Sequence, residues 1–253
     1  MTDILLMVSR SLRNSLRVPA AVLPNIAISV FFLFVFNSGL SSVANLPGFK
    51  GSYLAFIIPV SIVSASVGGA GTAGQLLIRD IESGYFTKLL LTRSSRLALV
   101  WGPMVAGAVL LVGQVILILL LGLALGLKSA TGVGGMFVVL VYAFLWGMAF
   151  AGYAVAVSLK SKNSAAAQAA TFAFFPLIFL STTFVPKAYI TATWLKWAAT
   201  INPTTYIYDS MRSLLIDGWQ ARPLLIGFGV VLGFATLTGA LALRQARRAT
   251  QLG

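Results

Sequence analysis

Long apolar stretches alternate with short polar segments along almost the whole chain. Six of these stretches are long enough to cross a hydrocarbon core about 30 Å thick, which takes about 20 helical residues. A backbone within lipid has to satisfy its own hydrogen bonds, and no stretch alternates like a barrel strand, so all six are expected to be helices. The expected spans are residues 20–41, 53–78, 97–127, 133–159, 164–184 and 224–243. The pattern therefore predicts an all-α integral membrane protein with six transmembrane helices in a single domain, residues 1–253.

The polar segments between the spans predict the orientation of the chain. With the N-terminus inside, twelve of the 18 Lys and Arg residues fall on the cytoplasmic side and six outside. Because positive charge concentrates on cytoplasmic segments, both termini are expected to face the cytoplasm.

Residues 1–19 precede the first span and have the pattern of an amphipathic helix. Apolar side chains share one helical face and basic ones another, which is typical of a helix lying on the inner leaflet. The apolar positions are Leu5, Val8, Leu12 and Leu16, and the basic ones are Arg10, Arg13 and Arg17. Two interpretations stay open: a basic anchor that sets topology, or an arm that transmits motion to the first span.

Composition excludes several classes of function. The chain is 58% hydrophobic and 9% charged, against about half and about a quarter in soluble domains. It has no Cys and no His, and so lacks thiol nucleophiles, imidazole bases and the commonest zinc and copper ligands. We therefore expect no catalytic, metal or cofactor site in the chain. The net charge of +13 is dispersed among membrane-flanking segments, which favours contact with anionic membrane lipids and disfavours nucleic-acid binding.

The placement of acidic residues bears on the source of energy. The five carboxylates are Asp3, Asp80, Glu82, Asp209 and Asp217, and none lies within an expected span. Proton- and sodium-coupled transporters hold their ion on a titratable or anionic group inside the membrane, so that class is disfavoured. A Walker A motif, G-x-x-x-x-G-K-[ST], is also absent from the sequence. Any uphill transport is therefore expected to draw its energy from a partner.

Residues 79–96, RDIESGYFTKLLLTRSSR, form the largest expected cytoplasmic loop. Acidic and aromatic residues come first, and apolar residues follow between charged neighbours. An amphipathic helix here would expose more apolar surface than a connector needs, which favours docking of another protein. Charges that merely sit at the membrane surface would give the same periodicity, so both interpretations stay open.

Residues 185–223 form a long segment on the expected outer side. It holds Trp194, Trp197 and Trp219 and three tyrosines, as is common at a membrane interface. The break at Asn202-Pro203 predicts two short helices that lie on the outer leaflet or re-enter it. An enzyme site is the competing idea, with Asp209, Arg212 and Asp217 as its only ionisable candidates.

The string GAGTAG, from Gly69 to Gly74, matches the spacing of a dinucleotide-binding loop. That loop needs a preceding strand and a following acidic residue, whereas this string continues an apolar span. Small residues at four-residue spacing instead predict close packing of another helix. We expect this packing, and a bend in the span, at Ser61, Ala65, Gly69, Ala70, Ala73 and Gly74.

Aromatic residues cluster in the first and fifth expected spans and are suited to an apolar or amphipathic cargo. Polar groups within or beside the spans could contact cargo or a neighbouring helix. The candidate lining residues are Asn25, Phe32, Phe36, Gln75, Phe172, Phe175 and Phe179. Ordinary lipid-facing residues would give the same pattern.

These features together resemble a known family. Six spans in about 250 residues, the acidic-then-basic segment after the second span and a Pro-x-x-Tyr-x-x-Asp-x-x-Arg pattern before the last span resemble the permease subunit of a type-2 ABC exporter. The resemblance is to the daunorubicin-resistance and nodulation-factor branch, and it covers nearly the whole chain. The Pro-x-x-Tyr-x-x-Asp-x-x-Arg pattern, with the residue before it, gives the set Asn202, Pro203, Tyr206, Asp209 and Arg212.

The resemblance implies a partner and a mechanism. In that family the segment after the second span is a coupling helix seated in a separate ATPase subunit. It implies two ATP-binding subunits, which hold the ATP and Mg, and a second copy of this chain or a sibling permease. It also implies a bacterial or archaeal cell (inner) membrane. The docking residues would be Asp80, Glu82, Gly84, Tyr85, Phe86, Lys88, Leu89, Leu90 and Arg96.

Three functions therefore stay open for the chain. The first is an exporter permease that moves a drug, lipid or glycolipid-like cargo by alternating access and is not an enzyme by itself. The second is a channel or facilitator that needs no ATPase. The third is a membrane-embedded enzyme or assembly factor.

Overall fold

The computed structural model describes residues 2–17, 19–47, 49–69, 71–85, 88 and 96–249. These residues form helices joined by turns, with no strand among them. The helices are, in chain order, α1 (Thr2–Leu16), α2 (Pro19–Gly39), η1 (Ser41–Asn45), α3 (Tyr53–Gly69), α4 (Thr72–Glu82), α6 (Arg96–Ala124), α7 (Gly132–Ser161), α8 (Ser164–Phe172), α9 (Phe175–Phe179), η2 (Lys187–Tyr189), α10 (Thr193–Ile201), α11 (Pro203–Arg212), η3 (Ser213–Asp217) and α12 (Ala221–Ala249). The all-α class predicted from the sequence is thus confirmed for this part of the chain.

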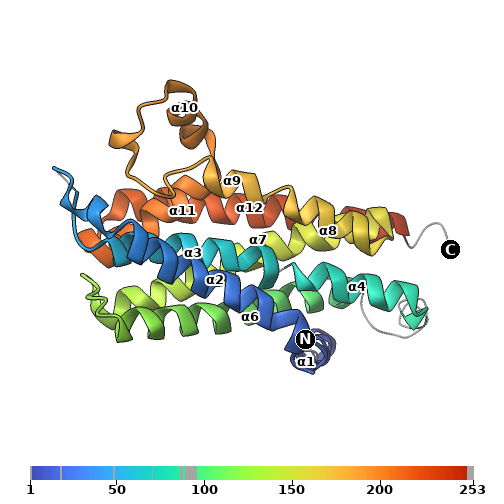
Figure 1. Ribbon diagram of the computed structural model, residues 1–253. Helices are drawn as coiled ribbons and strands as arrows, with labels where there is room; N and C mark the ends of the chain where they lie inside the picture. Colours follow the sequence, from blue (N-terminus) through green and yellow to red (C-terminus); the bar gives the residue numbers. More distant parts are fainter. Residues whose placement is uncertain are drawn as a thin grey trace.

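The long helices lie side by side and give the molecule an elongated shape (Figure 1). α2, α3, α6, α7 and α12 share one long axis, and α4 follows α3 along it. The turns at residues 40–52 and 125–131 gather with η3 at one end, called here the loop end. The tip of α4 and the start of α8 lie at the other, called the α4 end (Figure 1).

Four helical runs among the described residues are long and apolar enough to cross a membrane. They are Tyr53–Glu82, Ala98–Ala124, Gly132–Ser161 and Ala221–Arg248, and they correspond to the second, third, fourth and sixth expected spans. The first and fifth expected spans correspond to shorter apolar helices, Leu23–Gly39 and Gln168–Phe179. Four spans therefore have the expected length, and six stays a prediction.

The fifth expected span is broken instead of forming one helix over residues 164–184. α8 ends at Phe172, and α9 covers only Phe175–Phe179. Beyond α9, the Ser181 and Thr183 hydroxyls both donate to the carbonyl of Ile178. Such side chains replace the backbone donors that would continue a helix. The run of Ser and Thr after α9 therefore explains why the helix stops before Phe184.

α3 is the central helix of the fold. Every residue from Tyr53 to Val67 is buried, which is expected of a helix that is apolar or small on all faces. It packs against α2, α6, α7 and α11. The small residues expected to bring another helix close are thus used inside this chain. α12 lies at the other extreme, with much of its apolar surface exposed at residues such as Leu225, Leu237 and Leu241.

Two short helices depart from the common axis. α1 is seen nearly end-on in Figure 1, so it lies across the bundle, and it packs mainly on α6. Its Ser11 and Ser15 are buried, whereas Leu5 is 66% exposed, so part of the expected apolar face does not contact the bundle. α10 stands to one side of the bundle, where Trp194 and Trp197 are exposed (Figure 1).

Candidate functional site

At the α4 end, a side chain of α1 binds the end of α4. The Arg10 guanidinium donates two hydrogen bonds to the Asp80 carboxylate, at 3.0 and 2.6 Å. Its central carbon also lies 4.2 Å from the centre of the Tyr85 ring. A bidentate pair of this kind fixes direction as well as distance. The expected interfacial helix is therefore tied to the expected docking segment.

The docking segment begins as a continuation of α4. Asp80 and Glu82 lie in its last turn, and Gly84 has a φ of +70°, a left-handed conformation that ends the helix. Glu82 and Tyr85 are exposed, as is Lys88. Phe86, Leu89 and Leu90 lie outside the described residues, and Arg96 begins α6. The acidic half of the predicted docking set thus lies on an exposed turn, and the docking role itself stays a prediction.

Of the small residues in the second expected span, Gly74 lies at the contact between α4 and α7. Ser61, Ala65, Ala73 and Gly74 are all buried. A β carbon on Gly74 would lie 2.7 Å from Ser158 Oγ and 2.8 Å from the Ala154 carbonyl oxygen, so only glycine fits here without a shift.

The expected bend in this span stays a prediction, although the helix is interrupted between α3 and α4. α3 ends at Gly69 and α4 begins at Thr72, while Ala70 lies outside the described residues.

Most of the aromatic lining candidates meet in one cluster. Phe32 lies 5.1 Å from Phe36 between ring centres, and 6.4 and 6.3 Å from Phe175 and Phe179. Phe184 adds to the cluster through Phe36 and Phe179. This aromatic cluster joins α2 to α9, two elements far apart in sequence.

The remaining lining candidates lie elsewhere. Phe172 is 53% exposed and makes no ring contact within the described part of the chain. Asn25 packs against Gly68, at the contact of α2 with α3. Gln75 is half-buried on α4. The seven candidates therefore do not line one common surface in this structure.

Asn202 joins α11 to the end of α9. Its side-chain oxygen accepts from the Thr204 amide at 3.0 Å, which caps α11, and Pro203 occupies the first turn. Its amide nitrogen donates to the carbonyls of Leu177 and Leu180, at 2.5 and 2.9 Å. The two short helices predicted around Asn202-Pro203 are thus confirmed. Tyr206 contributes a hydrogen bond from its hydroxyl to the Thr200 carbonyl, at 2.6 Å.

Arg212 is a buried cation at the end of α11. Its side chain is 7% exposed and donates to the Phe56 carbonyl at 3.0 Å, the Thr182 hydroxyl at 2.9 Å and the Thr183 carbonyl at 3.4 Å. The guanidinium carbon also lies 3.4 Å from the centre of the Phe56 ring. Arg212 therefore connects α11, α3 and the segment after α9.

The electrostatics around Arg212 reflect its burial. Burial lowers the pKa of Arg212 to about 10, against the opposing effect of Asp209. Burial likewise raises the pKa of Asp209 above its usual range, although Arg212 and Lys187 act the other way. Only one carboxylate oxygen, on Asp209, lies within 4.0 Å of this guanidinium among the described residues. The buried cation is thus held mainly by neutral oxygen atoms.

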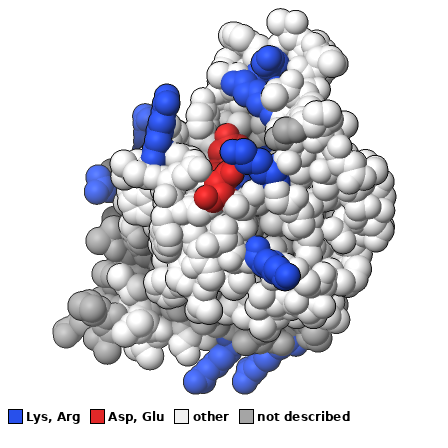
Figure 2. All heavy atoms as spheres, turned by 90° about the vertical axis from the view of Figure 1, so that its left-hand side faces the viewer, with Lys and Arg blue, Asp and Glu red and all other residues white. Residues whose placement is uncertain are grey.

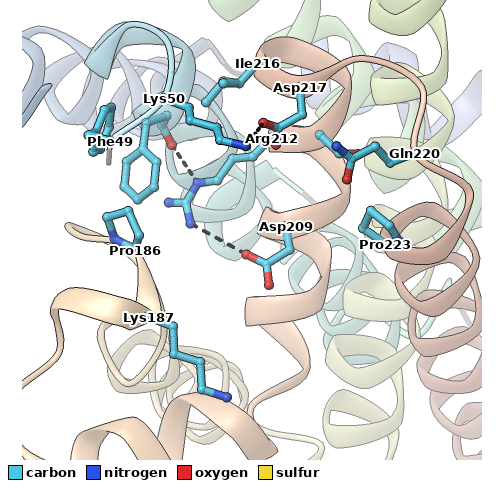
Figure 3. Close-up of a pocket in the computed structure, with 12 residues that line it drawn as sticks. Phe49, Lys50, Pro186, Lys187, Asp209, Arg212, Ile216, Asp217, Gln220 and Pro223 are labelled. Carbon is cyan, nitrogen blue, oxygen red and sulfur yellow. Dashed lines mark hydrogen bonds and ion pairs between the residues drawn. The ribbon is translucent and has the colours of Figure 1, made fainter. Parts of the chain in front are cut away.

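The loop end carries both signs of charge in one place. Figure 2 shows acidic side chains gathered in a single patch beside basic ones, on a face that is otherwise mostly uncharged. Lys50 and Asp217 form an ion pair of 3.9 Å there, near Arg212 and Asp209 (Figure 3).

Sequence reasoning missed several of these partners. Arg10 and Asp80 are 70 residues apart, and Phe56 and Arg212 are 156 apart. The buried bond from the Trp146 indole to Ser66, at 3.0 Å, spans 80 residues. Complementary charge was the only signal available for the first pair, and the carbonyl acceptors gave none.

Comparison with known proteins places these features in a family. The model of the ABC-2 type transporter family matches residues 2–216, from α1 through most of η3. A curated relative from Cyanophora paradoxa, named "Putative transport permease ycf38", is 24% identical over 204 residues. That alignment covers 80% of this chain and 69% of the relative. The matched region contains the α4 end contacts, the aromatic cluster and Arg212.

Proposed function

Because this chain belongs to the ABC-2 type transporter family, we propose that it forms the membrane pathway of an ATP-driven exporter. The chain is a multi-pass membrane permease, a transport subunit without an ATPase domain, and the family implies a separate ATP-binding partner. In the proposed complex, two partner subunits bind ATP and Mg. Two permeases, identical or sibling, surround the pathway.

The observation that carries this proposal is the helical run Tyr53–Glu82. It starts within the central, fully buried α3 and ends on the exposed Glu82 at the tip of α4. A push on this tip would act on a buried helix that packs against α2, α6, α7 and α11. Arg10 would pass the same motion to α1. We infer that residues 79–96 are the coupling segment and that the α4 end faces the ATPase in the cytoplasm.

The cargo is proposed to be apolar or amphipathic, as a drug, lipid or glycolipid-like molecule is. The aromatic cluster of α2 and α9 supports this class, because a change in the α2–α9 contact would expose a broad apolar surface.

The chain would cross a bacterial or archaeal cell (inner) membrane six times, and both termini would lie on its cytoplasmic side. α1 and α10 would lie at the two membrane interfaces. The exposed Leu5 of α1 and Trp194 of α10 suit such positions. We further propose membership of the daunorubicin-resistance and nodulation-factor branch.

Glu82→Ala tests the coupling role. We expect the permease–ATPase complex to form, but cargo-stimulated ATP hydrolysis to fall about tenfold, because the exposed acidic contact to the partner is lost. Co-purification and ATPase assays in nanodiscs measure both properties.

The matched control is Lys128→Ala, an exposed charge in a turn of the loop end that does not line the pocket found there. Stimulation that survives Glu82→Ala would contradict the proposed coupling. If the chain alone dissipates a solute gradient, the facilitator function is correct instead.

A charge exchange tests whether α1 takes part. Asp80→Arg should reduce stimulated hydrolysis, because it puts two cations together, and Arg10→Asp combined with it should restore a large part of the activity. The pair is partly exposed, so its effect on stability is expected to be only about 1 kcal/mol. The assay is ATP hydrolysis by each single variant and by the double variant. An activity in the double variant no better than in Asp80→Arg would show that Asp80 acts on hydrolysis by a route other than its pairing with Arg10.

A further inference from the structure

A pocket of about 320 Å³ opens at the loop end (Figure 3). Three segments that are distant in sequence form its walls: the turn before α3 with the start of α3, the residues before and within η2, and the stretch from α11 through η3 to the start of α12. Apolar surface comes from Phe49, Phe56 and Ile216, among others. Five of the residues that line it are charged: Lys50, Lys187, Asp209, Arg212 and Asp217. The volume lies in the range of small-molecule sites, and the walls combine apolar surface with a few charges, as such sites do.

The buried cation in this pocket is incompletely neutralised. Arg212 is 7% exposed, yet its carboxylate partner, Asp209, lies 4.0 Å away and is 52% exposed. A charge removed from water is costly unless it is closely paired. The guanidinium has five N–H donors, and three protein oxygens accept from it. An anionic group entering the pocket would supply the missing charge.

The other charges also keep bonding capacity for a ligand. The ion pairs Lys50–Asp217 and Arg212–Asp209, at 3.9 and 4.0 Å, are both longer than a hydrogen bond. No described carboxylate lies within 4.0 Å of the Lys187 ammonium. The two ion pairs that line the pocket thus have distances that leave their hydrogen-bonding atoms available to a ligand.

We propose that this pocket binds a zwitterionic headgroup that carries a phosphate and an ammonium, as in phosphatidylethanolamine. The phosphate lies against Arg212 and the ammonium lies against Asp209, while Lys187 and the Lys50–Asp217 pair add charge of both signs at the edge of the pocket. A purely anionic ligand would meet two carboxylates, and a purely cationic one would meet three cations. Only a ligand with both signs complements the whole wall. Phe49 and Ile216 provide apolar surface for the part of the ligand next to the headgroup.

This inference rests on the proposed function only in placing the loop end at the outer face of the membrane. There the pocket would hold either a membrane lipid or the headgroup of an amphipathic cargo. Binding does not require the ATPase, so it is measured without ATP. Failure of coupling and failure of this site are therefore distinguishable.

The test is native mass spectrometry of the detergent-solubilised full chain, titrated with phosphatidylethanolamine or phosphatidylglycerol. We expect the zwitterionic lipid to bind about tenfold more tightly. The double substitution Lys187→Gln with Asp217→Asn should remove this preference, whereas Lys196→Gln, an exposed change on α10 outside the pocket, should not. Lys187 and Asp217 lie at the pocket surface and not in the core, so the double variant is expected to fold.

Soluble competitors on the unaltered protein separate the two sources of the headgroup. Displacement of the lipid by O-phosphoethanolamine would support recognition of the free zwitterion. Retention of the lipid, together with a preference that depends on Lys187 and Asp217, would support a membrane-borne ligand. Equal binding of the two lipids, a preference that survives the double substitution, or displacement by inorganic phosphate alone would overturn the proposal.

Discussion

Replacement of Arg212 by Met is expected to lower the free energy of unfolding by about 1–3 kcal/mol. The substitution removes charge-assisted hydrogen bonds to Phe56, Thr182 and Thr183, and it leaves buried oxygen atoms without donors. The Phe56 carbonyl lies within α3, so the damage would reach the central helix. Arg212→Lys is expected to restore little, because one ammonium cannot reach three acceptors arranged around a planar guanidinium.

The measurement is thermal unfolding in detergent, followed by tryptophan fluorescence and by monodispersity in size-exclusion chromatography. Arg222→Met is the matched control, since Arg222 is exposed at the start of α12. If the two Met variants unfold at the same temperature, the guanidinium does not hold the loop end together. Recovery of full stability by Lys would show that charge alone is sufficient.

Gly74→Ala should destabilise the protein by about 1–3 kcal/mol, because the added methyl group collides with a backbone oxygen. The new β carbon would lie 2.8 Å from the Ala154 carbonyl oxygen, on a helix that cannot rotate away as a side chain can. α4 would have to move from α7, which would also displace the proposed coupling turn. Gly74→Leu should abolish transport for the same reason. Gly69→Leu is predicted to have a similar effect.

Gly113→Ala is the matched control, and its expected effect on stability has the opposite sign. A β carbon at this position of α6 would meet no atom within 4 Å, so Ala should stabilise the helix by about 0.4–1 kcal/mol. Thermal unfolding and ATPase stimulation of both variants make the comparison. Equal behaviour of Gly74→Ala and Gly113→Ala would mean that the α4–α7 contact is looser than the structure has it.

The sequence predicted elements better than it predicted contacts. The break at Asn202-Pro203 was found because Asn caps a helix and Pro starts one, and both effects are local. For residues 79–96 the sequence predicted an amphipathic helix, whereas α4 ends at Glu82 and Gly84 turns the chain. The docking role of this segment stays a prediction. The early end of α9 was missed, because its Ser and Thr hydroxyls compete with the backbone in a way that hydropathy does not register.

The small residues of the second expected span show what spacing along the chain does not specify. Their spacing predicted close helix packing, but spacing does not identify the helix that packs there. The structure assigns that place to α7 of the same chain, through Ala154 and Ser158. In the same way, four of the aromatic lining candidates meet in one cluster and Phe172 does not, because the break after α8 changes which side chains face α2.

By itself, the sequence determined that this is a membrane protein and that its backbone is helical. Apolar runs of this length and hydropathy lie in lipid, where the backbone has to form its hydrogen bonds internally, and a helix does so. It also located the capped break before α11. Only the tertiary structure decided that α3 is central, that Arg10 binds Asp80 and that Arg212 is buried on Phe56. The reason is physical: hydropathy and local spacing describe a helix and its nearest neighbours in the chain, whereas these contacts depend on how helices far apart in sequence pack together.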